Sequence, residues 1–214
     1  MRARTLDDAE AVAREAAQLV ADALRGGART LVLAGGSTPR RAYQLLADVP
    51  LEWGRVSVLF GDERCVAPDH PESNYRMARE ALLERVHPGS VHRMPAELGP
   101  EEGARLYEEV VRALAPLDLV LLGIGPDGHT ASLFPGSPRL EATGFAVAVH
   151  DAPKPPPERV SLTLPVLREA RQVLILATGE DKADAVAKAR EGVVPAGLLP
   201  DAEFLLDRAA AARL

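Results

Sequence analysis

The sequence predicts an α/β protein whose sheet is mostly parallel and is covered by helices on both faces. Short apolar runs, typical of fully buried strands, alternate along the chain with longer segments of helical periodicity. The chain has 214 residues, of which 47% are hydrophobic and 26% are charged, as in an average globular protein with a sizeable core. We therefore expect one domain that spans residues 1–214.

The elements are predicted from periodicity and from the residues that end each segment. In residues 7–25 apolar side chains recur at helical spacing, Thr5 and Asp8 resemble a capping box, and two glycines follow the last turn. Residues 61–73 are expected to form a long polar loop. The other helices are expected over residues 38–48, 74–85, 101–114 and 181–191, and the strands over residues 30–34, 56–60, 117–124, 145–149, 173–177 and 204–206.

Composition excludes several classes of protein. The formal net charge of −6 argues against a general nucleic-acid binder, which usually has a basic face. No apolar stretch is long enough to span a membrane, and the first residues do not resemble a secretory signal, so we expect a cytoplasmic protein. The single cysteine, Cys65, excludes a disulfide framework and a cysteine-based zinc cluster, and it is expected to be an ordinary reduced thiol. Nothing in the sequence indicates the oligomeric state.

The loop at residues 35–39 has the composition of a phosphate site. In parallel sheets ligands bind beyond the carboxyl ends of the strands, and this Gly-Gly-Ser-Thr-Pro loop follows one such strand. Glycine lets the backbone approach a ligand, Ser37 and Thr38 offer hydroxyl groups, and the following helix offers free N–H groups. The alternative is a tight turn in which Thr38 is the N-cap and Pro39 the first helical residue.

Two further strand-end loops carry polar side chains. The loop at 61–66 contains Asp62 and Arg64, which indicate either a site or a surface cluster of salt bridges. The loop at 123–130 contains Asp127 and His129, and a histidine there can take a proton from water. This loop also matches G-x-G-x-x-G, but a proline lies inside it and no full helix can follow, which argues against a dinucleotide site.

Two isolated cations complete the candidates. Arg159 lies in the segment Glu-Arg-Val-Ser-Leu-Thr, and Lys182 lies at the start of a predicted helix, where the helix dipole disfavours a cation. Each could be an exposed charge, but an anionic ligand would explain both. The remaining histidines have no partners at metal-ligand spacing, and no G-x-S-x-G nucleophile motif is present.

Together these loops resemble the 6-phosphogluconolactonase family. The matching segments occur in family order over residues 33–186. They are LAGGSTPRRAYQLL (33–46), FGDERCVAPDHPESNYRMAREALL (60–83), LDLVLLGIGPDGHTASLFPGS (117–137), PKPPPERVSLTLPVL (153–167) and ATGEDKADAV (177–186). The resemblance implies a Rossmann-like fold and hydrolysis of 6-phospho-D-glucono-1,5-lactone to 6-phosphogluconate, the second step of the oxidative pentose phosphate pathway. It implies no organic cofactor, and no metal is expected.

The resemblance also implies a role for each candidate residue. His129 would be the general base that activates water, Asp127 would orient it, and Arg64 would stabilise negative charge on the lactone oxygen. Asp62 and Asn74 would support the site without forming the reaction centre. The residues expected to bind the phosphate are Gly36, Ser37, Thr38, Arg159 and Lys182.

Two other functions stay open. The same superfamily contains glucosamine-6-phosphate deaminases, so the chain could be a phosphosugar deaminase or isomerase. In those enzymes a glutamate follows the histidine motif, whereas here no acidic residue lies between His129 and Glu141. A non-catalytic phosphosugar sensor is the second alternative, although it would not need His129.

Overall fold

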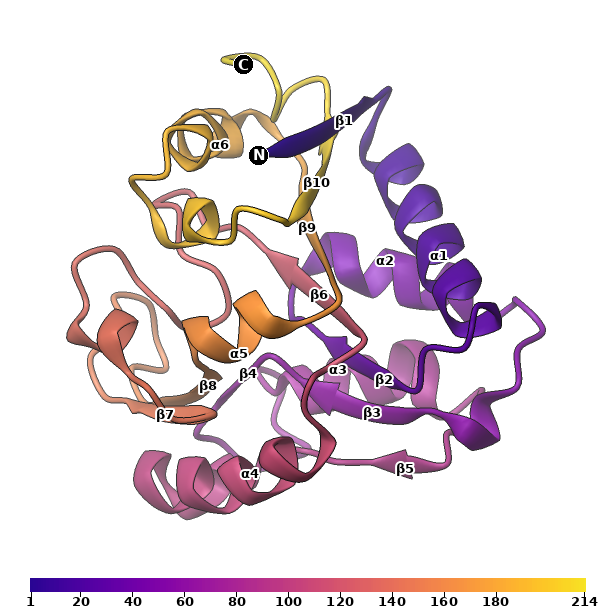
Figure 1. Ribbon diagram of the computed structural model, residues 1–214, viewed down its shortest axis with the longest axis vertical. Coiled ribbons are helices and arrows are strands. Elements are labelled where there is room, and N and C mark those ends of the chain that lie inside the picture. Colours follow the sequence, from indigo (N-terminus) through magenta and orange to yellow (C-terminus); the bar gives the residue numbers. More distant parts are fainter.

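The centre of the protein is a seven-stranded parallel sheet, seen in the computed structural model, which describes residues 1–214 (Figure 1). The strand order is β1-β10-β9-β6-β2-β3-β5, and every neighbouring pair is parallel. A second, antiparallel sheet has the order β4-β8-β7. The strands are β1 (Arg2–Leu6), β2 (Thr30–Leu33), β3 (Ser57–Phe60), β4 (Asp62–Arg64), β5 (Ser90–Val91), β6 (Leu119–Gly123), β7 (Ala146–Val149), β8 (Arg159–Leu162), β9 (Gln172–Ala177) and β10 (Glu203–Asp207).

The chain winds through the large sheet in two directions. From β2 it proceeds to β3 and β5, whereas from β6 it proceeds the opposite way to β9 and β10. Right-handed crossovers then place the helices of the two halves on opposite faces, so the predicted fold class is confirmed. The α-helices are α1 (Ala9–Arg25), α2 (Ser37–Leu46), α3 (Asn74–Ala78), α4 (Pro100–Leu114), α5 (Leu164–Glu169) and α6 (Ala183–Arg190).

Short helical segments complete the chain. A π-helical segment, η2, continues α3, and the other segments are single 3-10 turns. They are η1 (Trp53–Arg55), η2 (Arg79–Leu83), η3 (Ala96–Leu98), η4 (Pro138–Glu141), η5 (Glu180–Lys182) and η6 (Pro195–Leu198). No helix is long and apolar enough to cross a membrane.

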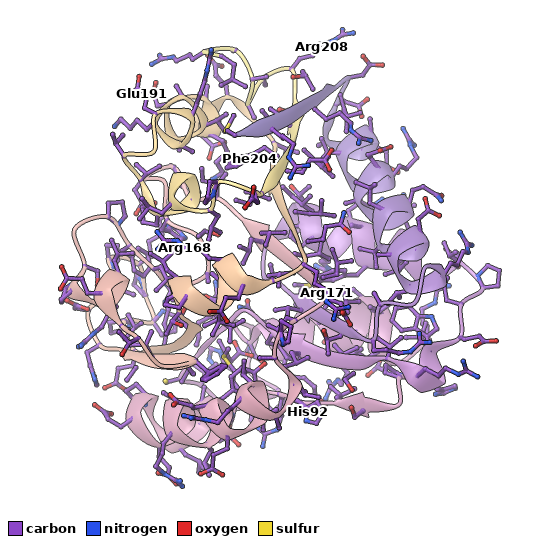
Figure 2. All side chains as sticks on the ribbon, in the orientation of Figure 1. His92, Arg168, Arg171, Glu191, Phe204 and Arg208 are labelled. Atoms are coloured by element: carbon purple, nitrogen blue, oxygen red, sulfur yellow. The ribbon has the colours of Figure 1, made fainter.

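The core lies on both faces of the large sheet. Every residue of β2 is buried, as a strand covered on both sides requires. On one face Val12 and Ala16 of α1 pack with Leu176 of β9 and Leu205 of β10. Phe204 of β10, labelled in Figure 2, belongs to the large core cluster and is 1% exposed.

Several predicted boundaries are wrong for identifiable reasons. The capping box with Thr5 does not form, because residues 2–6 are an exposed edge strand, β1, with no apolar run to reveal it. The side chain of Asp8 instead caps α1 by accepting from the N–H of Ala11 at 2.8 Å. Thr38 is not an N-cap either, since α2 already starts at Ser37.

The smaller sheet was also missed in part. Residues 61–73 are not wholly loop, because β4 pairs there with β8. The strand predicted at 145–149 exists as β7, but it belongs to the small sheet. The sequence analysis predicted no strand at β8, and it missed α5 and the two-residue β5.

Candidate active site

A cavity of about 500 Å³ opens where the two halves of the sheet diverge. Strands β2 and β6 are neighbours there, but their connections leave in opposite directions, which creates a crevice beyond their carboxyl ends. Four of the side chains that line the cavity are cationic and two are carboxylates. The cavity therefore suits an anionic ligand of small-molecule size.

The loop after β2 presents the N-terminus of α2 to this cavity. Gly36 has φ 110° and ψ 164°, a conformation that favours glycine, and it places Ser37 in the first turn of the helix. No side chain caps α2, so N–H groups of its first turn remain available to a ligand. Oγ1 of Thr38 lies 2.7 Å from Oγ1 of Thr178, which follows β9.

Two buried tyrosines hold the strand ends from which the site loops depart. The hydroxyl of Tyr43 accepts from the N–H of Ala34 at 2.8 Å and donates to its carbonyl at 3.0 Å. Tyr107 makes the same pair of bonds with Phe60, at 2.8 and 3.0 Å. Burial raises the pKa of both tyrosines, so the hydroxyls stay protonated and can donate. The two tyrosines thereby help to fix these strand ends.

The loop after β6 brings a carboxylate and an imidazole together. Oδ1 of Asp127 lies 2.6 Å from Nδ1 of His129 and also accepts from the backbone N–H of His129 at 3.2 Å. Burial would raise the pKa of Asp127, but the hydrogen bond and the charge of the imidazole outweigh it and lower the pKa. An ionised Asp127 can only accept, so Nδ1 of His129 carries a proton, and Nε2 is the ring nitrogen that can accept one when the imidazole is neutral.

Two arginines face the cavity from adjacent strands. Arg64 of β4 and Arg159 of β8 are register partners, an unfavourable pairing of like charges unless an anion lies near them. Neither forms a salt bridge with a carboxylate, and Nε of Arg64 is buried without a partner. Burial lowers the pKa of Arg159, Asp62 opposes this, and Arg64 adds to it. The pair is arranged to receive negative charge from a ligand.

The side chain of Arg159 is fixed by the proline-rich loop. Its Nε donates to the carbonyl of Pro156 at 3.0 Å, and its Nη2 donates to the carbonyl of Lys154 at 2.8 Å. The guanidinium lies 5.7 Å from the ring centroid of Phe134, and that ring lies 4.7 Å from the ring of His129. Phe134 is thus a spacer between the arginine and the histidine.

Lys182 reaches the cavity from the loop after β9. It ends η5, and its Nζ lies 2.9 Å from Oδ2 of Asp181. The loop is held by Asp207, a 7%-exposed carboxylate at the end of β10 whose two oxygens accept from the N–H of Gly179 at 3.1 and 3.0 Å. Asp207 thereby fixes the segment that carries both Thr178 and Lys182.

Strand β4 is fixed to α3 by a buried carboxylate. Glu63 accepts from the N–H groups of Arg64, Asn74 and Tyr75, each at 2.8 Å, and from Oγ of Ser73 at 2.9 Å. Burial raises the pKa of Glu63, although these four bonds oppose the shift. Oγ of Ser73 also caps α3 by accepting from the N–H of Arg76 at 3.1 Å.

Asp62 and Asn74 form a second contact between the same elements. Nδ2 of Asn74 donates to the carbonyl and to Oδ1 of Asp62, at 2.9 and 3.1 Å. Asp62 and Glu63 are both buried and join no salt bridge, so the alternative of a surface cluster of salt bridges is wrong. The two acids instead set the shape of the cavity wall.

The structure brings nearly all of the predicted site residues to one cavity. Asp127 is the exception, since it lies behind His129 and does not line the cavity. Thr178 and Lys154 also line the cavity and were not predicted, although Thr178 directly follows a predicted strand. No group of three or more His, Cys, Asp or Glu side chains is placed to hold a metal ion. The lining residues that were predicted are Gly36, Ser37, Thr38, Asp62, Arg64, Asn74, His129, Arg159 and Lys182.

Comparisons with known proteins show the family to which the chain belongs. A family model described as "Glucosamine-6-phosphate isomerases/6-phosphogluconolactonase" matches residues 5–206. A 6-phosphogluconolactonase of Streptomyces coelicolor is 41% identical over 235 aligned positions, covering 96% of this chain and 90% of that protein. One of Mycobacterium tuberculosis is 43% identical over 90% of this chain and 87% of its own length. The solved 6-phosphogluconolactonase of Trypanosoma brucei superposes with a TM-score of 0.90 at 27% identity, covering 100% of this chain and 98% of that one.

Proposed function

The chain belongs to the glucosamine-6-phosphate isomerase/6-phosphogluconolactonase family, and from this membership we propose that it hydrolyses 6-phospho-D-glucono-1,5-lactone to 6-phosphogluconate. The relatives at 41% and 43% identity support an enzyme of the 6-phosphogluconolactonase type. The observation that carries the proposal is that His129, which is hydrogen-bonded to Asp127, and the N-terminus of α2 line one cavity.

In this mechanism His129 is the general base. Its Nε2 takes a proton from a water molecule, whose oxygen attacks the lactone carbonyl carbon and forms a tetrahedral oxyanion. The oxyanion collapses, the bond from that carbon to the ring oxygen breaks, and the imidazolium returns its proton to the ring oxygen. The products are a carboxylic acid, which ionises, and a hydroxyl group. Asp127 stabilises the imidazolium and keeps Nδ1 protonated throughout.

Arg64 stabilises the oxyanion. Its Nη1 donates to the carbonyl of Glu72, which orients the guanidinium. Its Nε has no partner within the protein. A fixed cation at the cavity wall is suited to charge that develops only in the transition state.

The phosphate group binds in the same cavity. The phosphate group carries close to two negative charges. They are compensated by the N-terminal turn of α2, with Gly36, Ser37 and Thr38, and by the cations Arg159 and Lys182. Since Arg159 is buried and has no carboxylate partner, a phosphate would compensate its charge. This interaction supplies binding rather than chemistry.

The sequence after the histidine motif favours the lactonase over a deaminase. Residues 130–140 contain no acidic side chain, and the acid that does contact His129 is Asp127. A sensor would have no need of this carboxylate–imidazole pair. The proposal also includes a single domain over residues 1–214, a cytoplasmic location and a role in the second step of the oxidative pentose phosphate pathway.

A coupled assay tests this proposal. The lactone is produced in place by glucose-6-phosphate dehydrogenase, and its decay is followed with and without the protein. Acceleration above spontaneous hydrolysis is the expected result. Release of ammonia from glucosamine 6-phosphate without lactone hydrolysis would instead establish the deaminase. Binding of 6-phosphogluconate with neither reaction would establish the sensor.

A further inference from the structure

A buried hydrogen bond joins two segments of the cavity wall that are far apart in the sequence. Oγ of Ser132 donates to Oδ2 of Asp62 at 2.6 Å. Ser132 is 1% exposed and Asp62 is 7% exposed. The N–H of Ser132 also donates to Oγ of Ser161, at 3.1 Å. A bond from a hydroxyl to a carboxylate is strong at this length and in a buried position, so it ties the turn after His129 to β4.

That turn has a backbone conformation that other contacts must impose. Thr130 and Leu133 bridge each other through backbone hydrogen bonds. Between them Ala131 has φ 49°, and it is the single residue other than glycine with a positive φ. A left-handed alanine is unfavourable and persists only where its surroundings hold it. Ala131 lines the cavity, so relaxation of the turn would alter the wall beside His129.

The contact between Asp127 and His129 cannot by itself fix the imidazole relative to the sheet. Both residues lie in one loop, so their bond sets the rotation of the ring but moves with the loop. On one side the carbonyl of Gly128 accepts from the N–H of Ala196 at 3.2 Å. On the other side two side chains hold the loop: Oγ1 of Thr130 donates to the carbonyl of Gly123 at the end of β6, at 2.9 Å, and Ser132 ties the loop to β4.

We propose that Ser132 is a positioning residue that acts through Asp62 to hold His129 at the cavity; this inference rests on the proposed function. Both carboxylate oxygens of Asp62 are occupied, one by Ser132 and the other by Asn74. Asp62 is therefore committed to holding two segments of the wall and is not a second general base. The Ser132–Asp62 bond fixes where the imidazole of His129 lies, whereas the bond to Asp127 fixes how the ring is rotated.

The variant Ser132→Ala tests this role in two independent ways. In lactone hydrolysis kcat should fall by about tenfold or more while KM changes less than about twofold, because the phosphate loop is untouched. In the ligand-free protein the ring NMR signals of His129, assigned with His129→Ala, should move. The matched control is Ser57→Ala, which removes a hydroxyl that accepts from Oγ of Ser90 at 2.9 Å at the far end of the sheet.

A second variant and a double-mutant cycle guard against misfolding and purely structural effects. Ser132→Cys keeps much of the side-chain volume but donates weakly, so it should change kcat and the His129 signals in the same direction. On an Asp62→Ala background, Ser132→Ala should cost kcat much less than it does in the wild-type chain, because its partner is already absent.

The outcomes separate this inference from the proposed function. A wild-type rate equal to spontaneous hydrolysis would contradict the lactonase, and the His129 signals would then decide the inference alone. Signals that move with Ser132→Ala but not with Ser57→Ala would support it. A folded Ser132→Ala variant with wild-type His129 signals, or with kcat within about twofold of an active wild type, would overturn it.

Discussion

Replacing Gly125 by alanine should displace the imidazole of His129 and leave the rest of the site unchanged. A Cβ atom on Gly125 would lie 2.0 Å from Nδ1 of His129 and 2.6 Å from Oδ1 of Asp127, whereas real Cβ contacts are essentially never under 3.0 Å. The nearest ring atom must therefore move by at least 1.0 Å, from 2.0 to 3.0 Å. The backbone of Gly125 is not left-handed, so no further strain arises.

The expected magnitude follows from this displacement. A misplacement of about 1 Å in a reacting group costs about 10²-fold in rate, which is about 2.7 kcal/mol in the activation free energy. The imidazole is at the cavity wall and 18% exposed, so it can swing outward. The unfolding free energy should then fall by no more than about 1–3 kcal/mol.

The assay compares kcat and KM for lactone hydrolysis in Gly125→Ala and Gly54→Ala. A Cβ atom on Gly54 would have no neighbour within 4 Å, and this glycine lies in η1, away from the cavity. The first variant should lose kcat about 10²-fold with KM within about twofold of wild type, and the control should match wild type. A folded Gly125→Ala protein with wild-type kcat would refute the role given to the Asp127–His129 contact.

Three other perturbations test separate parts of the structure. Tyr107→Phe removes the hydroxyl that bonds both the N–H and the carbonyl of Phe60. The unfolding free energy should fall by about 2 kcal/mol, which a thermal denaturation scan would show as a decrease in Tm of about 4–8 °C. Burial first, and then nearby acidic charges, raise the pKa of Cys65 to about 12. Its alkylation by iodoacetamide at pH 8 should therefore be about a thousandfold slower than in the urea-unfolded chain, and the rate should increase about tenfold per pH unit. Equal rates in the folded and unfolded chains would contradict the raised pKa. Asp207→Ala frees the loop that carries Lys182, so steady-state kinetics should show KM raised about tenfold with little change in kcat. An unchanged KM would contradict this role of Asp207.

The buried strands could be predicted because their environment leaves a strong trace in the sequence. A strand covered on both faces is apolar along most of its length, and β2 and β3 accordingly lie within a residue of their predicted bounds. An edge strand or a strand in a cavity wall is under no such demand. β1 is largely exposed, and β4 consists of Asp, Glu and Arg, so both have the composition of a loop.

The site was predictable to the extent that function is concentrated at strand ends. The Gly36–Thr38 loop, His129 and Lys182 were identified because each follows a buried strand. Contacts with a distant partner could not be predicted in this way, even for Thr178, which directly follows a predicted strand. Ser132 meets an acid 70 positions away in the chain, and Thr178 meets a threonine 140 positions away. Neither has a local sequence feature that indicates its contact.

The measurement that tests the central claim most directly is the turnover and product binding of His129→Ala. If His129 activates the water, hydrolysis of the lactone should fall to near the spontaneous rate, while 6-phosphogluconate should still bind with its wild-type Kd, because the phosphate loop and Arg159 are intact. Wild-type turnover in the folded variant would contradict the claim. Equal loss of turnover and of binding would contradict it as well, since it would make His129 a structural residue.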